Sequence, residues 1–271
     1  MLVKRTIVSL ILLPIGLALI AIGGPLYAGF ITLILGLAAW EYDRIMRTGG
    51  YKPGGVLVVG GAALIALARA MDGFESAGWV ISLILLASLA YHLVNFERGE
   101  SQAATNFGIT VGGTFYLGWI GAYLISLRAL PDGKWWVLVV LPAVWFADSG
   151  AYLVGSRFGR HKMTPRLSPK KSWEGYLGGI LFSVIGTTLL VLLMQQWFSF
   201  GTAIHPWMGA IIGLLMAVIT PLGDLGESMF KRQVGLKDSG NLIPGHGGVF
   251  DRIDSWLWAG VIGYYTILWL L

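Results

Sequence analysis

Residues 174–197, with the sequence EGYLGGILFSVIGTTLLVLLMQQW, decide the fold class of this chain of 271 residues. The stretch has one charged side chain, Glu174, at its first position and is otherwise mainly apolar. A helix that crosses a bilayer needs about 20 consecutive apolar residues, because the hydrocarbon core is roughly 30 Å thick. The stretch therefore predicts a transmembrane helix.

The composition extends this prediction to the whole chain. Hydrophobic residues make up 56% of the chain and charged residues 12%, with a mean hydropathy of +0.73, whereas an average soluble domain is about 25% charged. We therefore expect an integral membrane protein. The chain has no cysteine, which excludes a disulfide framework and a thiolate metal site, so any bound metal must use oxygen or imidazole ligands.

Apolar runs of suitable length predict an all-α, polytopic membrane protein with about nine transmembrane helices. The runs are 6–24, 26–43, 54–71, 77–96, 106–128, 135–155, 174–197, 206–230 and 255–271. Merging the short third run with a neighbour gives eight helices as the alternative. The first run lacks a convincing small-residue cleavage site, so we interpret it as an uncleaved anchor. We expect a single integral membrane domain over 1–271, with N-terminal spans in about 1–130 and the catalytic part in about 135–271.

The distribution of basic residues predicts the orientation. With nine crossings and a cytoplasmic N-terminus, the cytoplasmic segments hold sixteen of the nineteen Lys and Arg residues, and only Arg69, Arg128 and Lys134 fall outside them. Membrane proteins concentrate Lys and Arg in cytoplasmic loops, so the asymmetry supports this topology. The polar site is then expected on the cytoplasmic side. The compact size and the absence of a transit-like presequence favour a bacterial inner membrane.

A first polar segment runs from Asp148 to Glu174 and holds six basic residues between its ends. Such a run could be a positive-inside stop signal that touches anionic lipid headgroups. The order of residues is more specific, with a Gly-Arg-His-Lys turn at 159–162 and Ser-Pro-Lys-Lys at 168–171. Backbone amides beside glycine, serine hydroxyls and lysine ammonium groups are typical phosphate-binding groups. The segment therefore indicates a phosphate site.

A second polar segment begins at Pro221, which favours a kink and frees carbonyl groups near the following carboxylate. At 3.6 residues per turn, Asp224, Glu227 or Ser228, and Lys231 share one stripe of a helix. Such a stripe on a membrane helix is expected to point into the bundle. The alternative for Asp224 is an internal ion pair with Lys231 or Lys171.

The loop that follows, 235–254, adds three carboxylates and one imidazole among five glycines. Acidic groups next to basic ones suit a hard cation that bridges to phosphate, and Mg²⁺ prefers one or two carboxylates together with substrate oxygens and water. A His-x-x-x-His spacing for zinc does not occur. His246 stands between two glycines, where bonding to a backbone carbonyl is as good an interpretation as ligand binding.

These residues carry a resemblance to a known family. Ser228 to Arg232, followed after four residues by Lys237 to Asp254, closely resembles the signature of phosphatidate cytidylyltransferases, also called CDP-diacylglycerol synthases, over 27 positions. The segment from Asp148 to Glu174 is similar to the other polar block of that family. The resemblance implies a Mg²⁺-dependent reaction, with a second cation as an option, in which phosphatidic acid and CTP give CDP-diacylglycerol and pyrophosphate.

The resemblance also implies roles for individual residues. The leading metal ligands are Asp224 and Asp251, and the secondary candidates are Asp148, Asp238 and Asp254. The groups that neutralise phosphates are Lys171, Lys237, Arg232 and Arg252, and further substrate contacts come from Ser168, Lys170, Ser172 and His246. Expected partners are CTP, phosphatidic acid and membrane lipids, with no nucleic acid and with a homodimer interface in the glycine-rich early spans as a further expectation.

Three other readings remain open from the sequence. A secondary transporter of an anionic solute also places charges in broken helices, although no inverted repeat of the charged motifs occurs in the N-terminal half. A CTP-dependent transferase or kinase could act on another lipid. A scaffolding membrane protein would not be stabilised by CTP and Mg²⁺.

Overall fold

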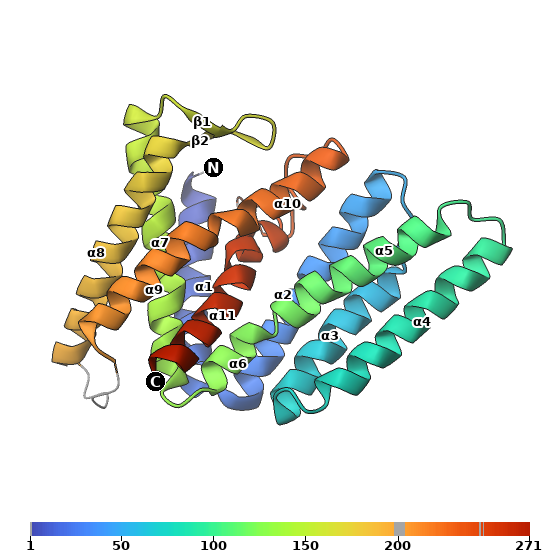
Figure 1. The fold of residues 1–271 in the computed structure, drawn as a ribbon, viewed down its shortest axis with the longest axis horizontal. Helices are drawn as coiled ribbons and strands as arrows, with labels where there is room; N and C mark the ends of the chain where they lie inside the picture. Colours follow the sequence, from blue (N-terminus) through green and yellow to red (C-terminus); the bar gives the residue numbers. More distant parts are fainter. Residues whose placement is uncertain (1, 198–203, 244, 246) are drawn as a thin grey trace. The chain divides into compact units, whose positions relative to one another are not determined.

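The computed structural model describes residues 2–197, 204–243, 245 and 247–271. These residues are almost entirely helical (Figure 1). The helices are α1 (Leu2–Ile22), α2 (Gly24–Thr48), α3 (Gly55–Asp72), α4 (Ala77–Glu97), α5 (Ala103–Thr114), the π-helix η1 (Phe115–Ile120), α6 (Tyr123–Ala129), α7 (Gly133–Phe158), α8 (Trp173–Trp197), α9 (Pro206–Ile219), α10 (Pro221–Gln233) and α11 (Phe250–Leu270). The chain forms two compact units, the first made of Met1–Ala129 and Phe230–Ile253 and the second of Leu130–Met229 and Asp254–Leu271.

Seven helical segments of the described residues are long and apolar enough to cross a membrane. They are Gly24–Thr48, Gly55–Asp72, Ala77–Glu97, Ala103–Ala129, Gly133–Phe158, Trp173–Gln196 and Pro206–Gln233. Each matches one predicted apolar run to within a few residues, so helices that could span a membrane are confirmed at these seven runs. Helices α1 and α11 cover the first and ninth runs, but α1 contributes only a shorter apolar segment, Leu10–Ile22. The count of nine crossings stays a prediction.

In the first unit, α2 is fixed on the segments of the predicted fifth span. The Tyr27 hydroxyl donates to the carbonyl of Leu124 at 3.2 Å, and the Tyr42 hydroxyl donates to the carbonyl of Ile109 at 3.1 Å. Because the fifth span is divided into α5, η1 and α6, these two bonds hold α2 at points on either side of the π-helix. Burial of small and branched residues along α2, such as Leu35, reinforces this packing.

In the second unit, α7, α8 and α9 pack together through glycines. A Cβ atom at Gly179 of α8 would lie 2.7 Å from the carbonyl oxygen of Ala147, and one at Gly213 of α9 would lie 2.6 Å from that of Ser183. Small residues let membrane helices approach this closely. Glycine therefore allows the close packing of these helices.

The helix that carries the second polar segment breaks as the sequence predicts. Helix α9 ends at Ile219 and α10 begins at Pro221. Because proline has no N–H group, the regular hydrogen-bond ladder is interrupted there. Near this break, the carbonyl of Val218 accepts a hydrogen bond of 2.9 Å from the Tyr176 hydroxyl on α8.

One element departs from the all-α prediction. The polar loop at 156–173 contains an antiparallel hairpin of β1 (Lys162–Thr164) and β2 (Ser168–Ser172), in which Lys162 pairs with Ser172. The Glu174 carboxylate, in the first turn of α8, accepts hydrogen bonds from the backbone amides of Arg160 and His161 and forms an ion pair of 2.5 Å with the His161 ring. This carboxylate therefore connects Arg160 and His161, just before β1, to the start of α8.

Two adjacent glycines on α5 allow a direct test of the packing of α2. A methyl group at Gly113 would overlap the Tyr42 ring, whereas one at Gly112 would meet nothing within 4 Å. Overpacking a tight site costs about 1–3 kcal/mol. We therefore expect Gly113→Ala to lower the thermal unfolding temperature in detergent micelles by several degrees and Gly112→Ala to leave it unchanged or slightly raised. Equal unfolding temperatures for the two variants would contradict this packing.

Candidate functional site

Three carboxylates come together in the second unit. Asp224 and Glu227 lie one turn apart on α10, and Asp254 lies in the first turn of α11. One ligand atom from each of them lies within 4.8 Å of the other two. Glu227 is buried and the other two are partly exposed. We call these three residues the acidic cluster.

A glycine allows α10 and α11 to approach closely enough to form the cluster. A Cβ atom at Gly223 would overlap the carbonyl oxygen of Asp254 and would lie 2.8 Å from the Trp258 ring. A larger residue at this position would therefore separate the helix that carries Asp224 from the helix that carries Asp254.

Lys171 supplies a positive charge at the edge of the acidic cluster. Its Nζ lies 2.6 Å from Oδ2 of Asp224, and both side chains are partly exposed. The ion pair that the sequence left as an alternative for Asp224 is therefore present. It does not exclude metal binding, because a carboxylate has two oxygens with about four acceptor positions.

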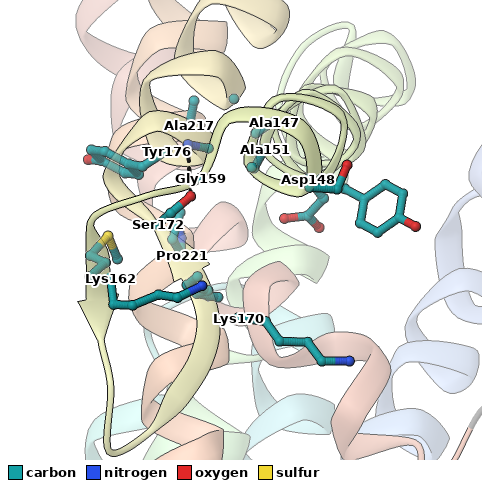
Figure 2. A pocket seen from close by; sticks show the side chains of 17 residues that line it. Ala147, Asp148, Ala151, Gly159, Lys162, Lys170, Ser172, Tyr176, Ala217 and Pro221 are labelled. Carbon is teal, nitrogen blue, oxygen red and sulfur yellow. Dashed lines mark hydrogen bonds between the residues drawn. The ribbon is translucent and has the colours of Figure 1, made fainter.

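A cavity of about 490 Å³ adjoins this ion pair. It lies between α7, the hairpin, α8 and the start of α10, and the charged residues that line it are Asp148, Lys162, Lys170 and Lys171. Figure 2 shows Asp148 projecting from α7 while Lys162 and Lys170 extend from the hairpin. Asp148 is close enough to Lys171 and Asp224 to interact electrostatically with both. The cavity therefore has three ammonium groups for anionic oxygens.

Ser172 forms part of the wall of this cavity and also ends the hairpin. Its hydroxyl accepts a hydrogen bond of 3.2 Å from the Gly175 amide and so caps α8. A Cβ atom at Gly159 would lie 3.1 Å from the Cβ of Ser172, and one at Gly155 would lie 3.2 Å from its Oγ. Glycine neighbours therefore leave room for the Ser172 side chain, which is buried. Ser168 begins β2 and is not among the lining residues.

Asp251, predicted as a leading metal ligand, lies in the first unit and has protein partners there. Its Oδ1 accepts a hydrogen bond of 2.6 Å from Lys231 Nζ, and both side chains are less than 10% exposed. Its Oδ2 accepts hydrogen bonds from the backbone amides of Ser239 at 3.0 Å and Gly248 at 2.9 Å. This carboxylate thus connects the end of α10, the loop and the start of α11.

The remaining candidates lie on the surface of the first unit. Arg232, Lys237, Asp238 and Arg252 are exposed. The guanidinium group of Arg232 donates to the carbonyl of Leu236 at 2.9 Å. His246 lies outside the described residues.

Three charged residues in or beside the polar segments were not among the site residues that we predicted from the sequence. Glu227 belongs to the acidic cluster, Lys162 lines the cavity, and Glu41 of α2 hydrogen-bonds to the loop after α10. The spacing of three residues placed Glu227 on one stripe with Asp224, but Glu227 was not assigned as a metal ligand. Glu41 had one signal only, which was a carboxylate inside the apolar run 26–43.

Comparison with known families agrees with this combination of acidic cluster and basic cavity. The model of the cytidylyltransferase family matches residues 3–270. The chain belongs to the cytidylyltransferase family.

Relatives within the cytidylyltransferase family match over most of their length. The chain is 37% identical to the phosphatidate cytidylyltransferase of Pseudomonas aeruginosa, with 99% of this chain and 97% of the relative covered. It is 32% identical to that of Mycobacterium bovis, with 94% and 85% covered. It is 31% identical to that of Staphylococcus saprophyticus, with 93% and 94% covered.

The acidic cluster of this cytidylyltransferase suits a divalent cation. Mg²⁺ binds oxygen at about 2.1 Å, so two of its ligand atoms are at most about 4.2 Å apart. The separations within the cluster, up to 4.8 Å, exceed this by little, and a small rotation of one carboxylate closes the difference. Two of the three residues, Asp224 and Asp254, are predicted metal ligands. The chain therefore has a group of acids that could hold a metal ion.

Gly223→Ala is expected to weaken the binding of a divalent cation. The added methyl group forces α10 away from α11 and spreads the acidic cluster, and overpacking of about 1.4 kcal/mol corresponds to a tenfold change in affinity. Mn²⁺ binding to the detergent-solubilised protein, followed by electron paramagnetic resonance, measures this change. Gly112→Ala is the control because its methyl group meets no neighbour. Equal Mn²⁺ affinity in both variants would mean that the cluster is not the metal site.

Proposed function

We propose that the protein is a phosphatidate cytidylyltransferase, which transfers CMP from CTP to phosphatidic acid and releases pyrophosphate. The family match over residues 3–270 carries this proposal, and the acidic cluster beside a cavity with three lysines supplies suitable chemistry. The protein is a multi-pass membrane protein by the length and composition of its helices, which suits a lipid substrate that stays in the bilayer.

The chemistry explains why positive charge matters more than a strong base. An oxygen of the phosphatidate phosphate attacks the α-phosphorus of CTP, and the bond between the α-phosphorus and the bridging oxygen to the β-phosphate breaks as pyrophosphate leaves. The attacking phosphate is already an anion, so a residue need not remove a proton from it. The barrier lies in bringing two anions together, which fixed cations lower.

The second unit offers residues for each part of this task. Lys162 and Lys170 extend from the hairpin at the cavity and are suited to binding CTP phosphates. Lys171 is placed between the cavity and Asp224, where it can orient a phosphate next to the acidic cluster. Bound Mg²⁺, held by Asp224, Glu227 and Asp254, would supply Lewis-acid neutralisation of phosphate oxygens.

We further propose roles in the reaction for the signature residues of the first unit. Asp251 remains a proposed metal ligand. Lys237, Arg232 and Arg252 are exposed and are proposed to neutralise phosphates, while His246 and Ser168 are proposed substrate contacts.

The membrane arrangement follows from charge. We propose a cytoplasmic N-terminus, nine crossings and a site at the cytoplasmic side of a bacterial inner membrane, because this topology leaves only three Lys and Arg residues outside the cytoplasmic segments. Phosphatidic acid would then keep its acyl chains in the bilayer while its headgroup reaches the site, and CTP would bind from the cytoplasm.

Isotope labelling tests the reaction. With purified protein, phosphatidic acid in detergent micelles and Mg²⁺, label at the α-phosphorus of CTP should appear in the lipid, and label at the γ-phosphorus should appear in pyrophosphate. Chelation of divalent ions should stop both. Transfer of the γ-label to lipid would identify a kinase instead, and absence of any labelled lipid would contradict the proposal.

The acidic cluster is tested by isosteric variants. Asp224→Asn, Glu227→Gln and Asp254→Asn should each lower turnover by on the order of 100-fold at low Mg²⁺, because each removes one negative charge from the ion. A higher Mg²⁺ concentration should recover part of the loss through mass action. Glu97→Gln, at an exposed position, should keep wild-type turnover. Near-normal turnover of Asp224→Asn and Asp254→Asn at limiting Mg²⁺ would remove them from the metal site.

A further inference from the structure

A carboxylate from the first half of the chain is buried against the loop between α10 and α11, which belongs to the family signature. Glu41 belongs to α2, 198 residues before Ser239, and is 0% exposed. Burial of a charged group in an apolar protein is unfavourable by several kcal/mol unless donors or cations compensate for it. The contacts of Glu41 therefore indicate why this residue occurs there.

Three hydrogen bonds to Glu41 come from the loop between α10 and α11 and from the first residue of α11. Oε2 accepts from the Ser239 hydroxyl at 2.8 Å and from the Phe250 amide at 2.8 Å, and Oε1 accepts from the Val249 amide at 3.0 Å. Ser239 lies near the start of the loop, and Val249 and Phe250 lie at its end. One carboxylate group therefore connects both ends of the loop.

The loop is shaped to receive this carboxylate. A Cβ atom at Gly240 would lie 2.6 Å from Oε1 of Glu41, and one at Gly248 would lie 2.6 Å from the same atom and would overlap Oε2 and the Ser239 hydroxyl. Only glycine leaves room for the carboxylate at these two positions. Two glycines of the signature are thus explained by a residue that lies outside the signature.

The residue that follows Glu41 anchors the same segments by packing. The Tyr42 ring makes edge contacts with Phe230 at 5.3 Å and with Phe250 at 6.5 Å between ring centroids. Phe230 is on α10 and Phe250 begins α11. Consecutive residues of α2 therefore hold the two helix ends and the loop between them.

The loop held by Glu41 in turn orients Asp251. The Ser239 hydroxyl donates to Glu41, while the Ser239 amide donates to Asp251. The Gly248 amide also donates to Asp251, and the next amide along the chain donates to Glu41. The two carboxylates thus share the loop between them, so a change at Glu41 must reach Asp251 through Ser239 and Gly248.

We propose that Glu41 is a positioning residue of the cytidylyltransferase site, which holds Ser239, Val249 and Phe250 in place and, through Ser239 and Gly248, the carboxylate of Asp251. The proposal rests on the proposed function for its effect on turnover, but the effect on the loop does not depend on the reaction. Glu41 acts through its contacts with the loop, and we do not propose that it touches the substrate.

Glu41→Gln is the sharpest variant because it keeps the size of the side chain. Its amide NH₂ must replace one oxygen, so at least one backbone N–H, that of Val249 or Phe250, faces another donor. We expect kcat to fall by about tenfold, with the KM for phosphatidic acid unchanged. The exchange of the 239–250 amides with deuterium should accelerate by about tenfold, more than in the rest of the protein. The Mg²⁺ concentration for half-maximal activity should rise.

Matched variants separate positioning from general stability. Glu97→Gln removes an exposed carboxylate of the same unit and should change neither kcat nor exchange. Ser239→Ala removes only the hydroxyl donor, so it should lower kcat less than Glu41→Gln. The double variant should be less impaired than the product of the two single effects, because both break the same contact. If Glu41→Gln does not fold, the kcat of Ser239→Ala and its amide exchange in 239–250 test the proposal instead.

Three results would overturn the proposal. The first is a Glu41→Gln variant with the kcat and the amide exchange rates of the wild type. The second is a loss of activity in proportion to the unfolded fraction, with exchange in 239–250 no faster than in the rest of the protein. The third is that the effects of Glu41→Gln and Ser239→Ala on kcat are independent of each other. A wild-type protein without labelled CDP-lipid would instead refute the proposed function and with it the effect on turnover. The exchange experiment would still show whether Glu41 holds the loop.

Discussion

The unfavourable burial of negative charge in an apolar protein constrains the whole polar part of this molecule. A carboxylate that leaves water must accept hydrogen bonds or meet a cation. Glu41 meets two amides and a hydroxyl, and Asp251 meets an ammonium group and two amides. In the acidic cluster, Asp224 pairs with Lys171, and the three carboxylates lie within 4.8 Å of one another, where like charges repel. A divalent cation relieves this repulsion, whereas Glu41 accepts its hydrogen bonds from Ser239, Val249 and Phe250.

The helices could be predicted from the sequence because each one depends mainly on local composition. A membrane helix satisfies its own backbone hydrogen bonds, so an apolar run of sufficient length is enough to indicate it. The interruption at Pro221 was predictable for the same reason. The hairpin at 162–172 was not, because its strands are short and rich in charge. Its attachment depends on Glu174, whose contacts with Arg160 and His161 form only after the chain turns back on itself.

The site was predictable in its chemistry but not in its contacts. The polar segments stand out because they crowd acids, lysines and glycines into an apolar chain, and this drew attention to Asp224, Asp254 and Lys171. Which acid meets which partner depends on tertiary packing, as in the pairing of Asp224 with Lys171 across 53 positions of sequence. Glu41 was missed because it lies near the end of an apolar run, far from the two polar segments, and two of its three donors are backbone amides that nearly any residue type would supply.

Glycines serve two different structural purposes in this chain. The difference between them explains why the loop needs Glu41. Gly179 and Gly213 let helices approach one another, because a Cβ atom at either position would meet a backbone carbonyl of the neighbouring helix. Gly240 and Gly248 make room for a particular pair of oxygens that arrives from α2. A loop with that shape has two unsatisfied amides and an internal space unless a carboxylate fills it, and buried amides without acceptors are unfavourable. The signature segment therefore does not specify its own geometry. The first half of the chain, which carries no phosphate-binding motif, completes the loop by supplying one side chain.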